Sequence, residues 1–493
     1  MIRHRGVLLG VMLLVSVTAS AAPTRFVGVN AHQPANDILD AIKDLGASWV
    51  RIDFNWFQAQ PQAGKAPDFT FFDGIVNAAI ARGLKVFPTV GYAPAWAAEP
   101  DADGKPNNNA PKPGEYGKFC QAAAAHFAGR ITHWGLWNEP NLGDFFEGTR
   151  QQWIDRVVVE GITGIKAGCP SCLVLGPEMA SIGGDYWVWL DDVLKQLKAK
   201  NMMFDIITWH IYAGFLELNP SWMCWSNDLF LHKLDAHRVC FGVHIGLSLR
   251  EVLLQNNLGN LPVWITETGR TAHLGAATEE ADQVTFYRRV LEEQVQRPWW
   301  THTFFYEIVD DNLINDKWGL AVRTGGAPSY PGSYQLKAVW AFLKKVLGAA
   351  AFGGTKTTDC DDGLDNDLDK LIDYPKDTDC ASLTAPAEGK VVPPDGGVKD
   401  GPPAPDAGGP GRESGGRDDI SVQRDVAITG DGTGSDGPRR DAPRTSGDGG
   451  GAGDGCACAL REGRPESGAG VALAALLLVV ALVARARRGG RGR

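Results

Sequence analysis

The chain has 493 residues, a formal net charge of −10 at pH 7, and 44% hydrophobic and 22% charged residues. This is an ordinary globular composition, with room for one large domain and several extensions. The acidic balance, without a basic stripe in the first 350 residues, argues against a nucleic-acid partner, because phosphate binding requires clustered positive charge.

Residues 1–22 have the features of a secretory signal peptide. Arg3 and Arg5 provide a basic start, Val7–Val17 is apolar, and Ala19–Ala22 offers small residues for cleavage. The apolar stretch is short for a bilayer span, so a permanent N-terminal anchor is the less favoured alternative. The segment therefore predicts an exported protein that folds outside the cytoplasm.

Residues 25–350 alternate short apolar runs with longer amphipathic ones. Strands are expected at Phe26–Asn30, Ser48–Asp53, Leu84–Val90, Ile131–Asn138, Leu173–Gly176, Phe204–Ile211, Pro262–Glu267 and His302–Ile308. The clearest helices between or after them are Glu115–Ala128, Asp185–Ala199, Thr278–Gln296 and Tyr334–Leu347. Eight strands alternating with about eight helices predict the α/β class and a (β/α)₈ TIM barrel. A doubly wound open sheet is the alternative, but no Gly-rich phosphate loop follows the first strand.

Two of the expected strands end in a glutamate. Glu139 lies in Trp137–Asn141 after the fourth strand, and Glu267 lies in Ile265–Gly269 at the end of the seventh. The C-terminal strand ends of a barrel build its active site, so both side chains should reach one mouth. Hydrolysis of a glycosidic bond needs two such carboxyl groups, one protonated and one ionised. A lone Asn-Glu-Pro is also common in ordinary loops, so the inference depends on the pair.

With Arg51 on the second strand and Trp209–Tyr212 on the sixth, these motifs resemble those of clan A of the glycoside hydrolases. This clan of retaining (β/α)₈-barrel enzymes includes families 5 and 39, and the resemblance runs from Phe26 to Leu347. It implies that Glu139 is the acid/base and Glu267 the nucleophile. It also implies that enzymes of this kind need no cofactor for catalysis.

The resemblance assigns supporting roles to four further residues. Arg51, at the end of the second strand, would keep the nucleophile ionised, and Tyr212 would contact it through its hydroxyl. Asn138 would bind the sugar 2-hydroxyl, and His210 would line the subsite near the acid/base. These roles agree with the rule that a neighbouring positive charge favours an ionised carboxylate and a neighbouring negative charge a neutral one.

Aromatic residues are expected to contact the sugar. Trp96, after the third strand, is the best candidate, because sugar rings stack on aromatic faces. The eighth strand reads Phe304–Glu307 where the family often has a tryptophan, so Tyr306 or a neighbour is expected to take that place. Glu307 is a third carboxylate near the mouth. The alternative is that these aromatic residues only pack the loops, because large aromatics dominate burial wherever they occur.

Nine cysteines suit an oxidising compartment. Their connectivity stays open, with three suggested pairs: Cys360 with Cys380, Cys224 with Cys240, and Cys169 with Cys172. The spacing of Cys169–Cys172 also occurs in redox motifs. A structural bridge is favoured there, because no thioredoxin-like pattern surrounds it.

Residues 358–381 form an Asp-rich module. Four aspartates occupy loop positions 1, 3, 5 and 9 of a calcium-binding pattern: Asp365, Asp367, Asp369 and Asp373. Lys370 and Lys376 stand where an EF-hand needs its glycine and its bidentate glutamate, so this is not an EF-hand. The segment resembles the calcium repeats of thrombospondin type 3 modules, which implies a structural calcium. A solvated acidic spacer is the alternative.

The remaining residues form a linker and a tail. Residues 385–455 are rich in Gly, Pro and Asp and should be disordered, because they cannot bury enough apolar surface. In residues 456–493, Cys456 and Cys458 precede an apolar segment at 469–484 and an arginine cluster. This tail resembles myxobacterial C-terminal sorting signals, which implies attachment at the cell surface. A plain single-pass membrane anchor is the alternative.

Together these features predict an exported retaining glycoside hydrolase with a monomeric catalytic domain that acts on poly- or oligosaccharides. The competing hypothesis is a non-catalytic carbohydrate-binding surface protein on a degenerate barrel. Such a protein would have lost a catalytic carboxylate, and here both are present. A barrel aldolase or isomerase is not favoured, because Lys85 lies at the start of the third strand rather than at its end.

Overall fold

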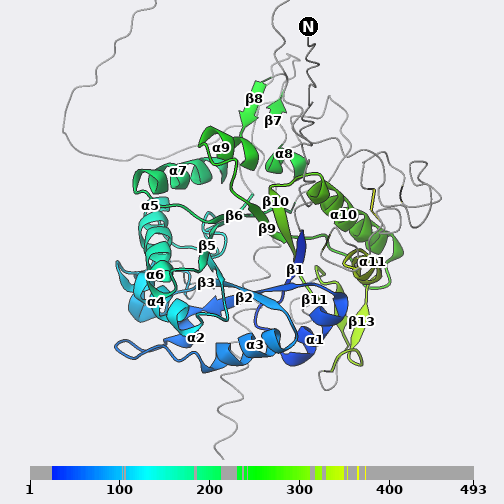
Figure 1. Cartoon of the computed structure of the whole chain (residues 1–493), viewed down its shortest axis with the longest axis horizontal. Coiled ribbons are helices and arrows are strands. Elements are labelled where there is room, and N and C mark those ends of the chain that lie inside the picture. Colours follow the sequence, from blue (N-terminus) through cyan, green and yellow to red (C-terminus); the bar gives the residue numbers. More distant parts are fainter. Residues whose placement is uncertain are drawn as a thin grey trace, which may run out of the picture. The chain divides into compact units, whose positions relative to one another are not determined.

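Eight parallel strands form a closed barrel in the computed structural model of the chain (Figure 1). Around the ring they follow the order β1, β2, β3, β4, β5, β6, β9 and β10, and β10 pairs with β1. Their bounds are Phe26–Asn30, Trp49–Asn55, Lys85–Gly91, His133–Leu136, Leu173–Ala180, Ile206–His210, Val263–Thr268 and Trp300–Phe305. The predicted (β/α)₈ barrel is confirmed, and the open sheet is excluded.

The structure describes residues 25–348 with internal gaps, together with residues 352, 364, 365 and 372. The gaps are 103, 105–106, 182–185, 213–229, 236–237, 241–242, 311–316 and 325–328. The predicted signal peptide, linker and tail lie outside the described residues.

Helices surround the barrel (Figure 1). The longer ones are α1 Asn36–Leu45, α3 Thr70–Ala81, α4 Glu115–His126, α6 Glu160–Gly168, α7 Tyr186–Ala199, α9 Leu249–Gln255, α10 Ala277–Val295 and α11 Ala338–Val346. Short helical segments are α2 Trp56–Ala59, η1 Ala95–Ala97, α5 Arg150–Trp153, η2 Ile154–Val159 and α8 Phe230–Leu234. Each long helix buries an apolar face, as in α1, where Leu39, Ile42 and Leu45 join the main core. The helices predicted around α4, α7 and α10 are confirmed.

A separate apolar cluster fills the inside of the barrel. It consists of Trp49, Phe87, Leu175, Ile206, Trp264 and Phe304. Rings on β2, β3, β9 and β10 contact one another in this cluster, which requires side chains that point inward. The interior is therefore a packed core, as is usual in (β/α)₈ barrels.

Two histidines stack on this inner cluster where the strands begin. The ring centroids of His302 and His133 lie 3.8 Å and 5.1 Å from that of Trp264. Burial, together with the charge of Lys85, lowers the pKa of His133 to about 4. Burial also lowers the pKa of His302, with His133 and Lys85 contributing. Both imidazoles are therefore neutral in the folded protein at neutral pH.

Replacing His133 by Phe is expected to reduce the acid sensitivity of the fold. Between pH 6.5 and about 4 the unfolded chain protonates His133 while the folded chain does not, so His133 makes the fold less stable as pH falls. The effect is at most about 3 kcal/mol across this window. Denaturant unfolding at pH 7.5 and pH 4.5 measures it. The control variant Trp49→Phe disturbs the same cluster without removing a titratable group. Equal pH dependence in wild type and His133→Phe would contradict the prediction.

Two small sheets were not predicted. β7 (Arg238–Cys240) and β8 (Val243–Gly246) form an antiparallel pair between β6 and α9. β11 (Val309–Asp310), β12 (Ala321–Arg323) and β13 (Tyr334–Leu336) form a three-stranded sheet after β10.

The predicted helix Tyr334–Leu347 is wrong at its start. Tyr334–Leu336 pairs with β12 in β13, and α11 begins only at Ala338. Arg323 and the hydroxyl of Tyr334 both bind Asp37 of α1. The contacts with Asp37 and with β12 hold Tyr334–Leu336 in an extended conformation. The helix therefore forms only from Ala338 onwards.

The structure tests one of the suggested disulfides. Cys169 and Cys172 are joined, which confirms the local pairing. Each of the other two pairs includes at least one cysteine outside the described residues.

The start of the Asp-rich module lies against the barrel domain. Leu364 is buried in the main core, and the backbone N–H of Asp365 donates to Glu292 of α10 at 3.1 Å. Asp367, Asp369 and Asp373 lie outside the described residues, so the calcium site stays a prediction.

Candidate active site

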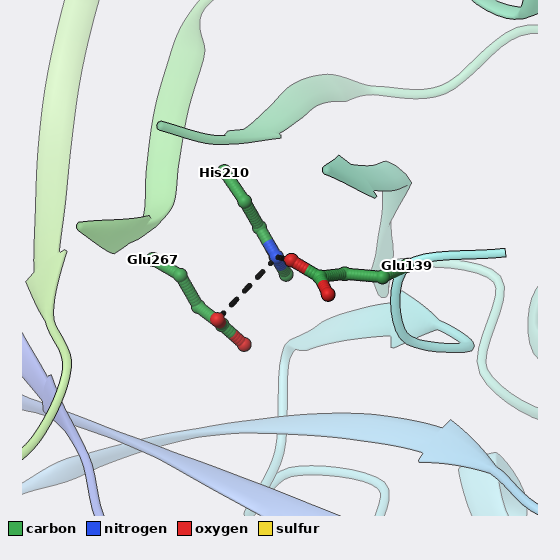
Figure 2. Close-up of side chains that lie close together, drawn as sticks. All are labelled: Glu139, His210 and Glu267. Atoms are coloured by element: carbon green, nitrogen blue, oxygen red, sulfur yellow. Dashed lines mark hydrogen bonds and ion pairs between the residues drawn. The ribbon is translucent and has the colours of Figure 1, made fainter. Parts of the chain in front are cut away.

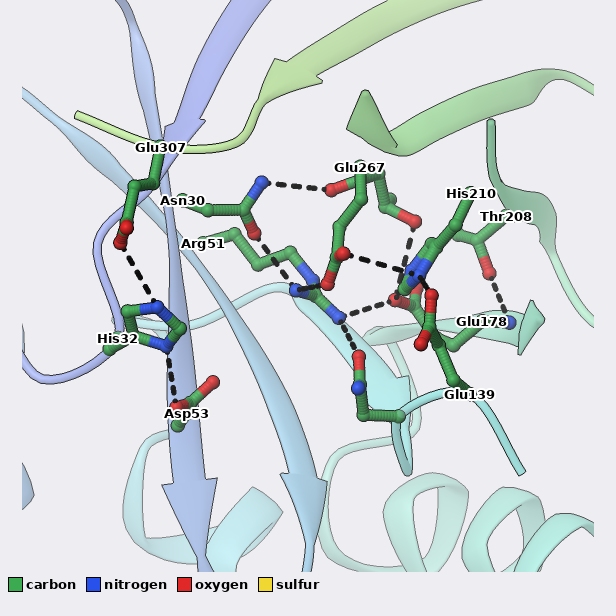
Figure 3. Close-up of polar contacts among 12 residues, drawn as sticks. Asn30, His32, Arg51, Asp53, Glu139, Glu178, Thr208, His210, Glu267 and Glu307 are labelled. Carbon is green, nitrogen blue, oxygen red and sulfur yellow. Dashed lines mark hydrogen bonds and ion pairs between the residues drawn. The ribbon is translucent and has the colours of Figure 1, made fainter. Parts of the chain in front are cut away.

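Polar side chains from several strands, or from the residues that follow them, meet at the mouth of the barrel, and Figure 3 shows most of them. They are Asn30 of β1, Arg51 of β2, Asn138 and Glu139 after β4, Glu178 of β5, His210 of β6, Tyr212 after β6, and Glu267 of β9. The structure thus brings together both predicted carboxylates and four predicted supporting residues.

The backbone around this mouth holds unusual conformations. Five non-glycine residues at the strand ends have positive φ: His32 (51°), Tyr92 (62°), Trp137 (63°), Glu139 (40°) and Glu178 (56°). The other described residues of this kind are three asparagines, which tolerate the left-handed region well. Each strained residue costs on the order of 1–3 kcal/mol, and such residues concentrate at functional sites. The fold therefore holds both Glu139 and Glu178 in conformations that ordinary packing does not require.

Glu267 is bound on both of its carboxylate oxygens. Arg51 donates from Nη1 to Oε1 at 2.7 Å, and the Tyr212 hydroxyl donates to Oε2 at 2.7 Å. Two donors, one of them charged, stabilise an ionised carboxylate. This is the state that a nucleophile needs.

Arg51 connects Glu267 to three other groups. Its Nη1 also donates to Asn30 Oδ1 at 2.8 Å, while its Nη2 donates to Asn138 Oδ1 and Glu178 Oε2, each at 2.9 Å. Burial alone would lower the pKa of Arg51, but the charges of Glu178 and Glu267 raise it instead. Arg51 was predicted at the end of the second strand. It lies inside β2, because that strand continues to Asn55.

Glu139 lies beside His210 and close to Glu267 (Figure 2). His210 Nδ1 is 2.9 Å from Glu139 Oε1 and 3.5 Å from Glu267 Oε2. Burial raises the pKa of Glu139 above its ordinary value; His210 opposes this rise, and the charge of Glu267 adds to it. Burial thus favours the neutral form of Glu139, while Glu267 accepts hydrogen bonds from Arg51 and Tyr212, an arrangement that suits an acid beside a nucleophile.

A sequence model of the family described as Cellulase (glycosyl hydrolase family 5) matches residues 17–305, more than half of the chain. The chain belongs to this family. The expected membership of clan A, drawn above from the strand-end motifs, is thereby confirmed.

A curated relative and two solved structures are similar to this family 5 chain at low sequence identity. A β-xylosidase of Geobacillus stearothermophilus is 23% identical over 261 residues, which cover 49% of this chain and 50% of that protein. The chain thus spans about half the length of the curated relative that it matches. A solved family 39 glycoside hydrolase from Bacteroides cellulosilyticus aligns with a TM-score of 0.50 and 18% identity, over 67% of this chain and 64% of that one. This similarity shows the fold alone. A β-xylosidase from Caulobacter crescentus aligns with a TM-score of 0.48 and 19% identity, over 66% and 69% of the two chains.

Glu178 of the family 5 chain was missed in the sequence. The fifth strand was expected to stop at Gly176, but β5 continues to Ala180 and includes this fully buried glutamate. Glu178 follows Pro177, two residues beyond the apolar run that ends at Gly176. At that place no alternation of apolar and polar residues indicates that its side chain faces inward. Its charge was the only available signal.

The two predicted aromatic contacts differ in their placement. The ring of Tyr306 meets that of Tyr212 edge-on, with centroids 6.2 Å apart, so it lies beside a hydrogen-bond partner of Glu267. Trp96 lies in η1, where it packs against Trp56 and donates to the carbonyl of Gln60 at 2.9 Å. These contacts fix Trp96 on the loop after β3 without linking it to the carboxylates. Its contact with substrate stays a prediction, as does that of Tyr306.

Glu139, His210 and Glu267 are also spaced closely enough to surround a metal ion, with one ligand atom of each within 4.8 Å of the others. Burial alone would lower the pKa of His210, but Glu267, Glu139 and Glu178 raise it to about 9. A cation would therefore meet the positive charges of both His210 and Arg51. Enzymes of this family need no cofactor for catalysis, which agrees with a site that works through its own side chains.

Proposed function

We propose that the chain is a retaining glycoside hydrolase. The observation that carries this proposal is the short separation of the two carboxyl groups, because an oxygen of Glu139 and an oxygen of Glu267 lie within 4.8 Å. Retaining enzymes hold their carboxyl groups about 5–5.5 Å apart. Inverting enzymes hold them about 6.5–9.5 Å apart, because a water molecule must fit between the base and the sugar.

The reaction proceeds in two steps. Glu267 attacks the anomeric carbon while Glu139 donates its proton to the departing oxygen, which leaves a covalent glycosyl-enzyme. Glu139, now ionised, then takes a proton from the water that attacks the same carbon and releases Glu267. Asn138 binds the sugar 2-hydroxyl through its amide NH₂, since Arg51 occupies its amide oxygen.

We propose β-linked poly- or oligosaccharides as substrates, with β-xylosides tested first because a curated relative is a β-xylosidase. The competing function is non-catalytic binding of carbohydrate at the cell surface. Both would use the same mouth, and only hydrolysis needs the paired protonation states of Glu139 and Glu267.

The test is a panel of xylan, mannan, β-glucan and galactan together with aryl β-glycosides. Bound polysaccharide and released reducing ends are measured in the same samples, and proton NMR identifies the anomer formed first. Release of a β anomer from a β-glycoside supports the proposal. Binding without release supports the competing function, and an α anomer formed first would overturn the retaining mechanism.

We also propose that the protein is exported and held at the cell surface by residues 456–493, and that residues 358–381 bind calcium. Support comes from the sequence patterns alone. In the part of the chain that the structure describes, no helix has the length and apolar character of a membrane span. Deleting residues 456–493 should release the protein into the medium, and an unchanged cell fraction would contradict the anchor.

A further inference from the structure

A buried carboxylate that the two-step reaction does not use lies directly behind the catalytic pair. Glu178 of β5 is 0% exposed, so it does not touch a substrate in the mouth. Its Oε2 lies 3.2 Å from His210 Nε2 and 2.9 Å from Arg51 Nη2 (Figure 3). The Thr266 hydroxyl donates to the same oxygen at 3.2 Å. Glu178 thus contacts the side chains that support both Glu139 and Glu267.

The contact with Glu178 determines where His210 carries a proton. Burial raises the pKa of Glu178, but Arg51 and His210 outweigh this effect and lower it, so the carboxyl is ionised. An ionised carboxylate only accepts hydrogen bonds, so His210 must hold a proton on Nε2. Its Nδ1 is then the nitrogen that can exchange a proton with Glu139, 2.9 Å away.

Glu178 also balances the charge of the site. Three carboxyl groups contact His210, namely Glu139 after β4, Glu178 from β5 and Glu267 from β9, and Arg51 from β2 binds the same oxygen of Glu178 as His210 does. Asp53, Tyr92 and Tyr212 lie further out around the same groups. With Glu139 protonated, the two cations Arg51 and His210 are balanced by the two anions Glu178 and Glu267. Without the charge of Glu178, the same state would be positive and would lose a proton more easily.

We propose that Glu178 is a positioning residue that acts through His210: it holds the proton on Nε2 and balances the imidazolium. The proton needed by Glu139 is thereby kept in the His210–Glu139 pair at higher pH. This inference rests on the proposed glycosidase function for its kinetic test, and on the geometry of Glu178 for its spectroscopic one.

The kinetic test is Glu178→Gln, which keeps the size of the side chain and an accepting oxygen but removes the charge. The alkaline limb of the kcat/KM profile is expected to move to lower pH by about one unit or more, because a neighbouring negative charge no longer favours the protonated pair. KM should change little, because Glu178 is out of reach of substrate. An alkaline limb at the wild-type position, with a lower rate at every pH, would overturn the proposal and leave Glu178 a structural residue.

The matched control is Glu293→Gln on α10. Glu293 is likewise buried and paired with arginines, Arg289 and Arg297, but it lies away from the mouth. This variant should keep both limbs of the wild-type profile. It measures what the loss of a buried carboxylate does to the fold alone.

A second measurement needs neither the Glu178→Gln variant nor hydrolysis. The full chain is labelled with ¹⁵N-histidine, and the signals of His210 are assigned by their loss in His210→Gln. At pH 10, above the pKa of about 9 at which His210 gives up the first of its two protons, the remaining proton should lie on Nε2. An unprotonated Nε2 would overturn the inference even if the chain proves to be a glycosidase. A protonated Nε2 in a chain that hydrolyses nothing would support the Glu178 contact while the proposed function fails.

Discussion

Replacing Glu267 by Ala is expected to lower kcat on an activated aryl glycoside by about 10⁴-fold or more, because no other group can form the glycosyl-enzyme. Glu267 is the carboxylate that Arg51 and Tyr212 hold from two sides. The variant also leaves Arg51 with one anionic partner fewer, so thermal unfolding should be recorded with the kinetics. The conservative variant Glu267→Gln removes the charge and keeps the shape of the side chain.

The product that Glu267→Ala forms in the presence of azide distinguishes loss of the nucleophile from other causes of a low rate. The small anion can enter the space left by the carboxylate and attack the anomeric carbon from that face. A single displacement then gives a glycosyl azide of inverted configuration. A wild-type rate, or an azide product of retained configuration, would contradict the assignment of Glu267 as nucleophile. Glu293→Gln, remote from the mouth, serves as the control for general effects of removing a carboxylate.

The positions of Glu139 and Glu267 could be predicted, because they follow from local sequence pattern and barrel topology alone. The apolar runs before Glu139 and Glu267 mark strands, and parallel strands in a closed barrel bring their C-terminal ends to one face. The roles of Arg51, His210 and Tyr212 came from the family resemblance. Their contacts agree with those roles, but no spacing in the sequence gives a distance between β2 and β9.

Glu178 could not be predicted for a physical reason. β5 extends past Gly176 because Met179 and Ala180 pair with Trp209 and His210 of β6, across a shift in register. Such pairing depends on the neighbouring strand and leaves no periodic signal in the fifth segment itself.

The start of α11 was missed for the same kind of reason. Tyr334 binds Asp37, 297 positions earlier in the chain, and pairs with β12 instead of beginning the helix. Local propensity predicts a helix there, and contacts between distant segments overrule it.

Replacing Glu139 by Ala is expected to have an effect that depends on the leaving group. With an unactivated glycoside the rate should fall by about 10²–10⁴-fold, the usual contribution of a positioned general acid. With an activated aryl leaving group, bond cleavage needs no proton, so the first step should be much less affected. The second step still lacks its base, so the glycosyl-enzyme should accumulate and give a burst of aryl alcohol in rapid-mixing experiments.

Azide should accelerate Glu139→Ala and give a product of retained configuration. It attacks the glycosyl-enzyme from the face that the leaving group has vacated, and as an anion it needs no base. Removal of Glu139 should also abolish the alkaline limb of the pH profile, because that limb reports the proton held between Glu139 and His210. An equal loss of rate on activated and unactivated substrates would contradict the assignment. Glu139 and Glu267 lie so close together that their positions alone do not distinguish the acid/base from the nucleophile. The azide products do, because Glu267→Ala should give the inverted configuration and Glu139→Ala the retained one.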